Sequence, residues 1–189
     1  MSQRAHRRTG ALAAAALAVA TGATVPAPSL GHPANDHTAH MQTDDLQSAR
    51  AATRKFRDVE VARAAGYVAA AECVQDRKYG GMGIHYSNRR LLADGRQDVT
   101  KPEILVYEPT PSGKLRLGAI GYFQADADQD LATDPDRPQL FSMPFDGPML
   151  GHETGMPVHY DLHVWLYRHN PAGLFAMWNP RVRCPDDEH

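Results

Sequence analysis

The sequence predicts an α+β domain in which an N-terminal amphipathic helix packs on a mainly antiparallel sheet with one disulfide. Three observations predict this class. Apolar residues recur at helical spacing after Asp44. Two segments rich in β-formers, residues 104–108 and 115–123, are joined by a short turn. Residues 158–167 alternate between apolar and polar side chains, as in a strand with two different faces.

The first segment, residues 1–27, has the layout of a secretory signal peptide. Three arginines precede an apolar run from Leu12 to Ala20, and Val25-Pro26-Ala27 offers a cleavage site. The run is too short for a stable transmembrane helix. The alternative is an Ala-rich first helix of a cytosolic protein. We expect an exported protein, secreted or held in the periplasm or cell envelope, with no transmembrane segment in the mature chain.

The mature chain divides into a flexible tail that contains histidines, residues 28–43, and a single globular domain, residues 44–189. Loss of three arginines and no acidic residue with the signal takes the formal net charge from −2 to −5. An acidic surface disfavours nucleic acid and anionic membranes as partners, and leaves a small molecule or a metal ion as the expected ligand. The sequence does not predict an oligomeric state.

The helix is expected to begin near Asp44 and to end at Gly66. Its apolar stripe is formed by Leu46, Ala49, Ala52, Phe56 and Val59. Farther along, three glycines from Gly80 to Gly83 predict a tight loop that delivers His85 to a shared site. A histidine that is simply hydrogen-bonded near the start of a strand is the alternative.

The two β-rich segments predict an antiparallel hairpin. Residues 138–149 are rich in Pro, Phe and Met without a clear period, which predicts a packed, irregular connection or lid. Five aspartates within residues 126–137 resemble a calcium loop in their spacing, but the glycine and the terminal glutamate are missing. A solvated acidic loop is the simpler interpretation.

The chain has two cysteines, Cys73 and Cys184. In an exported protein two cysteines predict one disulfide, here tying the end of the first helical region to the C-terminal tail. Use of either cysteine as a soft metal ligand is the alternative, although neither belongs to a CxxC pair.

The last predicted strand places His159, Asp161 and His163 on one face, with apolar residues on the other. His152 and Glu153 lie just upstream and can fold back over that face. Two imidazoles four residues apart are separated by about 13 Å along an ideal strand, so both reach one ion only if the strand bends. We therefore expect one or two groups from this strand to meet His85 or His152, with Asp161 as a ligand or as the carboxylate that orients a histidine.

Three blocks then suggest a family. They are Gly-Met-Gly-x-His-Tyr at residues 81–86, Leu-His-Val-Trp at 162–165 and Asn-Pro-x-Gly-x-Phe at 170–175. With their neighbouring residues they resemble a family of small exported, uncharacterised bacterial proteins, and the resemblance covers most of the mature chain. The resemblance implies no established activity, and it favours His85 and His163 over His159 and His152 as site residues.

These residues support three hypotheses. The first is a zinc or copper site built from His85, His159 and His163 and completed by Asp161, Glu153 or His152. The second is a metal-free enzyme in which a histidine and a carboxylate perform acid–base chemistry. The third is a binding or structural module of the cell envelope whose histidines only line an exposed strand face.

Overall fold

The computed structural model describes residues 35–70, 72–152 and 155–185, with side chains from His40 onward. The predicted signal peptide therefore lies outside the described residues. The chain enters through helix α1 (Asn35–Thr53), a 3-10 turn η1 (Arg54–Arg57) and helix α2 (Val59–Ala64). No described helix is both long and apolar enough to cross a membrane.

Helix α1 starts at Asn35 and not near Asp44, because no glycine or proline interrupts the segment before Thr53. The predicted single helix up to Gly66 is also wrong. At the break, the hydroxyl of Thr53 donates a hydrogen bond to the carbonyl of Ala49, which competes with the regular helical pattern. Asp58 then restarts the helix by accepting from the amide of Glu60.

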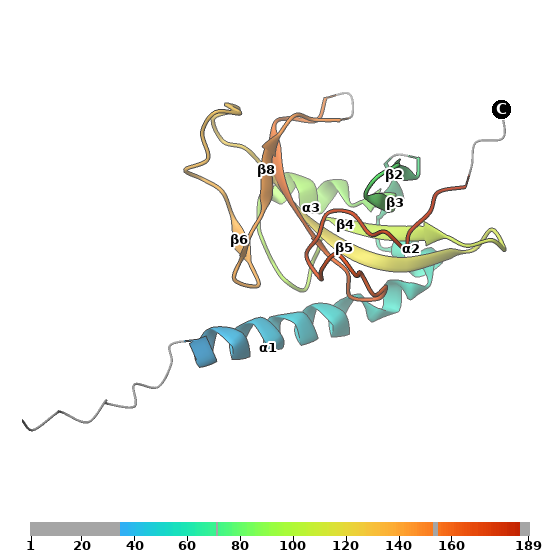
Figure 1. Ribbon diagram of the computed structural model, residues 1–189. Coiled ribbons are helices and arrows are strands. Elements are labelled where there is room, and N and C mark those ends of the chain that lie inside the picture. Colours follow the sequence, from blue (N-terminus) through green and yellow to red (C-terminus); the bar gives the residue numbers. More distant parts are fainter. Residues whose placement is uncertain (1–34, 71, 153–154, 186–189) are drawn as a thin grey trace, which may run out of the picture. The chain divides into compact units, whose positions relative to one another are not determined.

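Seven strands form the main antiparallel sheet, in the order β1-β3-β4-β5-β9-β8, with β2 paired to β3 (Figure 1). Their bounds are β1 Val68–Ala69, β2 Val74–Asp76, β3 Gly80–Ser87, β4 Ile104–Pro109, β5 Leu115–Ala125, β8 Asp146–Met149 and β9 His159–Val164. Helix α3 (Arg89–Asp94) connects β3 to β4, and strands β6 (Gln139–Leu140) and β7 (Met143–Pro144) form a separate pair. The predicted antiparallel sheet, including the β4–β5 hairpin, is confirmed.

Two sequence predictions about connections are corrected. The glycines from Gly80 to Gly83 belong to strand β3 and not to a loop. A side chain at Gly80 would lie 2.3 Å from the carbonyl oxygen of Asn179, so glycine there lets the C-terminal segment pack against the strand. Residues 138–149 contain β6, β7 and β8, and β8 forms an edge of the main sheet.

One face of the sheet forms the main hydrophobic core. Strand residues such as Tyr107, Tyr122 and Leu162 are almost fully buried there, and they form one cluster with Ala49 and Phe56 from the N-terminal helical segments. Packing of helix α1 along its whole length stays a prediction, because its first residues have no described side chains. The opposite face carries the histidines.

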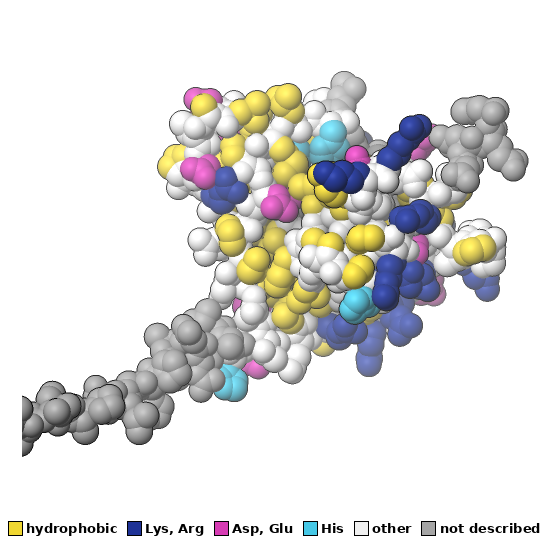
Figure 2. All heavy atoms as spheres, viewed as in Figure 1, with side chains coloured by type: hydrophobic (Ala, Val, Ile, Leu, Met, Phe, Trp, Pro, Cys, Tyr) yellow, Lys and Arg dark blue, Asp and Glu magenta, His cyan; other side chains and the backbone are white. Residues whose placement is uncertain are grey.

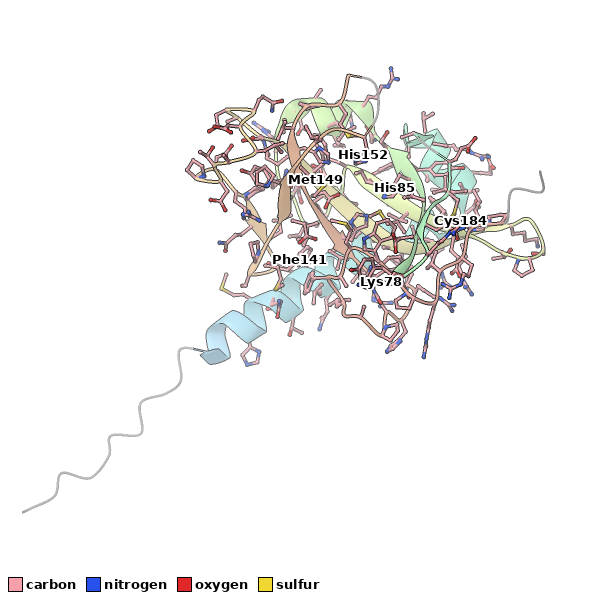
Figure 3. All side chains as sticks on the ribbon, turned by 45° about the horizontal axis from the view of Figure 1, so that its top comes forward. Lys78, His85, Phe141, Met149, His152 and Cys184 are labelled. Atoms are coloured by element: carbon pink, nitrogen blue, oxygen red, sulfur yellow. A yellow bond between two sulfur atoms is a disulfide. The ribbon has the colours of Figure 1, made fainter. Side chains whose placement is uncertain are left out.

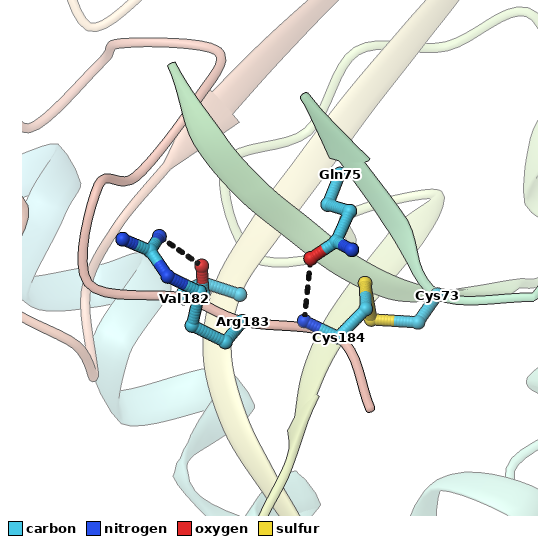
Figure 4. The surroundings of a disulfide bond; sticks show 5 residues. All are labelled: Cys73, Gln75, Val182, Arg183 and Cys184. Carbon is cyan, nitrogen blue, oxygen red and sulfur yellow. Dashed lines mark hydrogen bonds between the residues drawn. A yellow bond between two sulfur atoms is a disulfide. The ribbon is translucent and has the colours of Figure 1, made fainter. Parts of the chain in front are cut away.

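The predicted disulfide between Cys73 and Cys184 is confirmed, with 5.5 Å between the Cα atoms. It joins the start of β2 to the C-terminal segment. The amide of Cys184 also donates a hydrogen bond to the side-chain oxygen of Gln75 (Figure 4). The C-terminal segment is thus held against β2 and β3, and it places Val182 in a second apolar cluster with Val106, Ala119 and Trp165.

Candidate functional site

Strand β9 gives the site its first three residues. His159, Asp161 and His163 pair with Ala125, Phe123 and Gly121 of β5. Directly opposed residues of an antiparallel pair point to the same face, so these side chains share the face away from the main core. All three are buried. The alternation holds because Tyr160, Leu162 and Val164, the residues between and beyond them, are buried in the main core.

His85 reaches the same face from strand β3. It is paired with Val106 of β4, which is paired in turn with Ala119 of β5. Two strands therefore separate His85 from His163, a span of about 14 Å between backbones in a flat sheet. The imidazoles close this span, and their Nε2 atoms are 3.1 Å apart.

Ala119 and Gly121 occupy the same face of the intervening strand β5. A Cβ at Gly121 would lie 3.1 Å from Cβ of Ile104, so glycine there makes room for Ile104 of β4. The rings of His85 and His163 meet nearly at right angles, at 87°, with centroids 5.4 Å apart. In the absence of another ligand, one Nε2–H donates a hydrogen bond to the other Nε2.

Burial keeps both imidazoles neutral at neutral pH. It lowers the pKa of His85 to about 3, and the neighbouring His163 and His152 lower it further. Burial likewise lowers the pKa of His163 to about 4, with a smaller contribution from His152. Each neutral ring has one nitrogen with a free lone pair, which is the form that binds metal ions.

Asp161 lies beside His163 on the same strand face. Its Oδ1 is 3.9 Å from Nδ1 of His163, too long for a hydrogen bond. Both atoms are buried and lack a hydrogen-bond partner among the described residues. Burial is the main reason that the pKa of Asp161 rises to about 6, and Asp146 also raises it, while His159 and His152 lower it.

His159 does not join the His85–His163 pair. Its ring stacks on Phe123 with centroids 4.9 Å apart, and its Nδ1 lies 3.1 Å from the carbonyl oxygen of Pro157. Its other neighbour is His152, whose ring centroid is 5.3 Å away. We expected that two histidines four residues apart on a straight strand would not reach one ion. His159 and His163 do lie apart from each other, each beside a different partner.

His152 is a neighbour both of the His85–His163 pair and of His159. It is exposed, in the connection from β8 to β9, and contributes electrostatically to the pKa of His85, His159 and His163. Figure 3 shows His152 and His85 near one another on the same side of the sheet. Glu153, the last predicted ligand, lies outside the described residues. Among the residues that are described, no three His, Cys, Asp or Glu side chains are gathered closely enough to hold a metal ion together.

Sequence reasoning missed Asp146. This partly buried carboxyl lies on β8 opposite Asp161, and burial raises its pKa. Residues 138–149 have no clear alternation, so strand β8 was not predicted, and neither was the pairing of Asp146 with Asp161. The small residues of β5 were the available signal for the site, because glycine within a strand often marks a close approach of other groups.

Two hollows are found at the surface of the described residues, away from the histidines. Both flank the disulfide, and their linings share Gln75 and Cys184 and include none of the histidines. Comparison of the chain with family models, curated proteins and solved structures finds no match. The function must therefore be argued from the geometry of the histidine face.

Proposed function

We propose that the protein is an exported binder of a transition metal ion, zinc or copper, held by Nε2 of His85 and Nε2 of His163. The observation that carries this proposal is the 3.1 Å distance between these two nitrogens. Two nitrogens that each lie 2.0–2.1 Å from a tetrahedral ion are about 3.3–3.4 Å apart. Small rotations of the two rings therefore suffice to admit an ion.

The surroundings of His163 support the same proposal. A metal-bound histidine usually donates its other ring N–H to a carboxylate or carbonyl, which fixes the orientation of the ring. Asp161 is beside Nδ1 of His163, and both atoms lack a hydrogen-bond partner among the described residues. Shortening this contact from 3.9 Å would satisfy both groups and orient the imidazole for an ion at Nε2.

His152 is the third ligand in this proposal, and solvent supplies the rest. It is exposed, and electrostatically it is the neighbour common to His85 and His163. Rotation of its side chain would add a third imidazole from the β8–β9 connection. Imidazole ligands suit both zinc and copper, and an open position would let the ion bind water or a small molecule.

Export is part of the proposal. A disulfide and the lack of a membrane-spanning helix among the described residues are compatible with it, and the N-terminal signal pattern is its main support. Membership of the family of small exported bacterial proteins is proposed on the three sequence blocks alone. The acidic net charge supports a small ligand over nucleic acid as the partner.

A second candidate is a metal-free acid–base enzyme, favoured by Asp161. With a pKa of about 6, its carboxyl exchanges a proton near neutral pH, and neutral His163 is adjacent. In this case a chelator would leave turnover unchanged. A structural or binding module without either activity is the third outcome.

The deciding experiment is metal analysis of the mature, untagged protein in a background where the histidines that precede the sheet, His32, His37 and His40, are changed to Gln. Zinc and copper binding are measured by elemental analysis and by competition with a chromophoric chelator. His85→Ala and His163→Ala are the test variants. His169→Ala is the matched control, because His169 is exposed and contacts Arg181 instead of the cluster.

We expect about one ion per chain, lost in both test variants and kept in the control. Equal binding by the wild-type protein and the two test variants would overturn the proposal. A protein that takes up neither metal would move the function to the metal-free alternatives.

A further inference from the structure

The loop between β5 and β6, residues 126–137, has a buried carboxylate at its first position. Asp126 is 2 % exposed, and neither of its side-chain oxygens has a hydrogen-bond partner among the described residues. A buried carboxylate normally has several donors or a cation beside it, because losing water without replacement is costly. The interpretation of this segment as a solvated acidic loop fails at this residue.

The surroundings of Asp126 favour its protonated form and raise its pKa. Burial raises the pKa of Asp126 most, and the carboxylates of Asp128 and Asp136 raise it further. None of the groups that shift it is basic. Arg137, the basic residue at the end of this loop, is paired with Asp134 and the carbonyl of Phe145. None of these groups therefore balances the charge of Asp126.

The loop is held by Val158, the residue just before β9, and by Tyr160 of β9. Gln129 accepts from the amide of Val158 at 2.9 Å and donates to its carbonyl at 3.0 Å. Asp136 accepts from the hydroxyl of Tyr160, a fully buried core residue, at 3.0 Å. It also accepts from the amide of Ala127 at 2.9 Å. Each carboxylate has about four acceptor sites, so these bonds leave capacity for an ion.

We propose that this loop binds a calcium ion through the carboxylates of Asp126, Asp128 and Asp136. Calcium prefers six to eight oxygen ligands and tolerates irregular geometry, whereas magnesium requires a near-ideal octahedron. Asp126, Asp128 and Asp130 have the spacing of the first three ligands of a helix–loop–helix calcium loop. The glutamate position of that pattern is Arg137 here, and Asp136 immediately precedes it.

The three carboxylates are not drawn together tightly enough to hold an ion in this structure. Mutual repulsion of like charges has this effect, and a divalent cation reverses it. Three carboxylates without the bidentate glutamate define a weak site, so we expect a Kd of about 10⁻⁴–10⁻³ M, as in extracellular calcium modules. Figure 2 shows acidic side chains on the part of the surface where this loop lies in Figure 1.

The test is thermal unfolding and calorimetric titration of the mature protein after treatment with a chelator, with calcium chloride as the probe. Asp126→Asn and Asp128→Asn are the test variants. Asp134→Asn is the matched control, because Asp134 is exposed in the same loop and pairs with Arg137. Sodium chloride at equal ionic strength and magnesium chloride separate specific binding from general screening.

We expect 5 mM calcium to raise the Tm of the wild type and of Asp134→Asn by several degrees, and one ion to bind per chain. In Asp126→Asn and Asp128→Asn the rise and the titration heat should be lost. Without calcium, Asp126→Asn should melt at or above the wild-type temperature, because its buried charge is gone. A His85→Ala/His163→Ala double variant should keep the calcium response, which makes this result independent of the transition-metal proposal.

Two results would overturn the calcium site. A wild type with no calcium response beside a stabilised Asp126→Asn would identify Asp126 as a buried acid that carries a proton. An equal calcium response in Asp126→Asn, Asp128→Asn and Asp134→Asn would assign the effect to diffuse attraction by the acidic surface.

Discussion

Nε2 of His85 lies 3.1 Å from Nε2 of His163, although these residues are 78 positions apart in sequence and two strands, β4 and β5, lie between them in the sheet. Their meeting depends on the β3-β4-β5-β9 order and on a register that puts both side chains on one face of the sheet. A hydrogen bond between two neutral imidazoles accounts for the geometry without a metal. The unpartnered Nδ1 of His163 and Oδ1 of Asp161 are the observations that this hydrogen bond leaves unexplained.

Asp161→Asn separates the role of the carboxylate from that of the metal ligands. If Asp161 orients His163, the amide should lower zinc or copper affinity by about 10–100-fold while the stoichiometry stays at one ion per chain. Competition titration with a chromophoric chelator measures this change. Asp134→Asn, an exposed carboxylate elsewhere, should bind as the wild type does. Unchanged metal affinity in Asp161→Asn would show that the carboxylate does not orient His163 for metal binding.

The local parts of the fold could be predicted from the sequence. Alternation along residues 158–167 is a local signal, and it correctly separated His163 from Leu162. The hairpin of β4 and β5 and the pairing of Cys73 with Cys184 also follow from short-range composition and cysteine count. Each depends on rules that operate within a strand, a turn or a cysteine pair.

The candidate site depended on information that local patterns do not contain. His85 was singled out by its glycine-rich surroundings, but its distance from His163 is set by the strand order and by the register of β3, β4, β5 and β9. The burial of Asp126 was missed for a similar reason. Five aspartates in one segment predict a solvated loop, and only the folded structure shows that the first of them is enclosed, where its amide donates to the carbonyl of Val158 just before β9.

Removal of the disulfide should destabilise the protein and loosen the C-terminal segment. Cys73 and Cys184 are 111 residues apart, and in the chain-entropy model a loop of this length contributes about 4–5 kcal/mol, an upper expectation. Denaturant unfolding of a Cys73→Ser/Cys184→Ser variant measures the loss. Hydrogen exchange should rise most near Val182 and at the Gly81–Asn179 bridge. Reductant should change the wild type and leave the variant unaffected.

Because the pKa of Glu103 is raised in the folded protein, we expect the free energy of unfolding to fall as the pH rises. This carboxyl is 1 % exposed, and burial raises its pKa from 4.5 to about 8. The folded protein therefore holds the proton more tightly than the unfolded chain between those values, so unfolding releases a proton and is favoured by higher pH. The stability difference between Glu103→Gln and the wild type should grow by about 2–4 kcal/mol between pH 4.5 and pH 8. It should then level off.

Denaturant unfolding at several pH values measures this difference. The exposed Glu72→Gln is the control and should follow the wild-type pH dependence. A Glu103→Gln variant whose stability stays parallel to the wild type over the whole range would contradict the raised pKa.

Gly80→Ala and Gly113→Ala distinguish a steric requirement for glycine from a conformational one. Both glycines have positive φ, +97° and +74°, which any L-residue adopts at a cost of about 1–2 kcal/mol. A Cβ at Gly113 meets nothing within 4 Å, whereas a Cβ at Gly80 would lie 2.3 Å from the carbonyl oxygen of Asn179. Gly113→Ala should therefore lose only the conformational part. Gly80→Ala should lose several kcal/mol, because the backbone of the C-terminal segment must move away from β3. Equal losses in denaturant unfolding would show that this segment is not packed tightly on the strand.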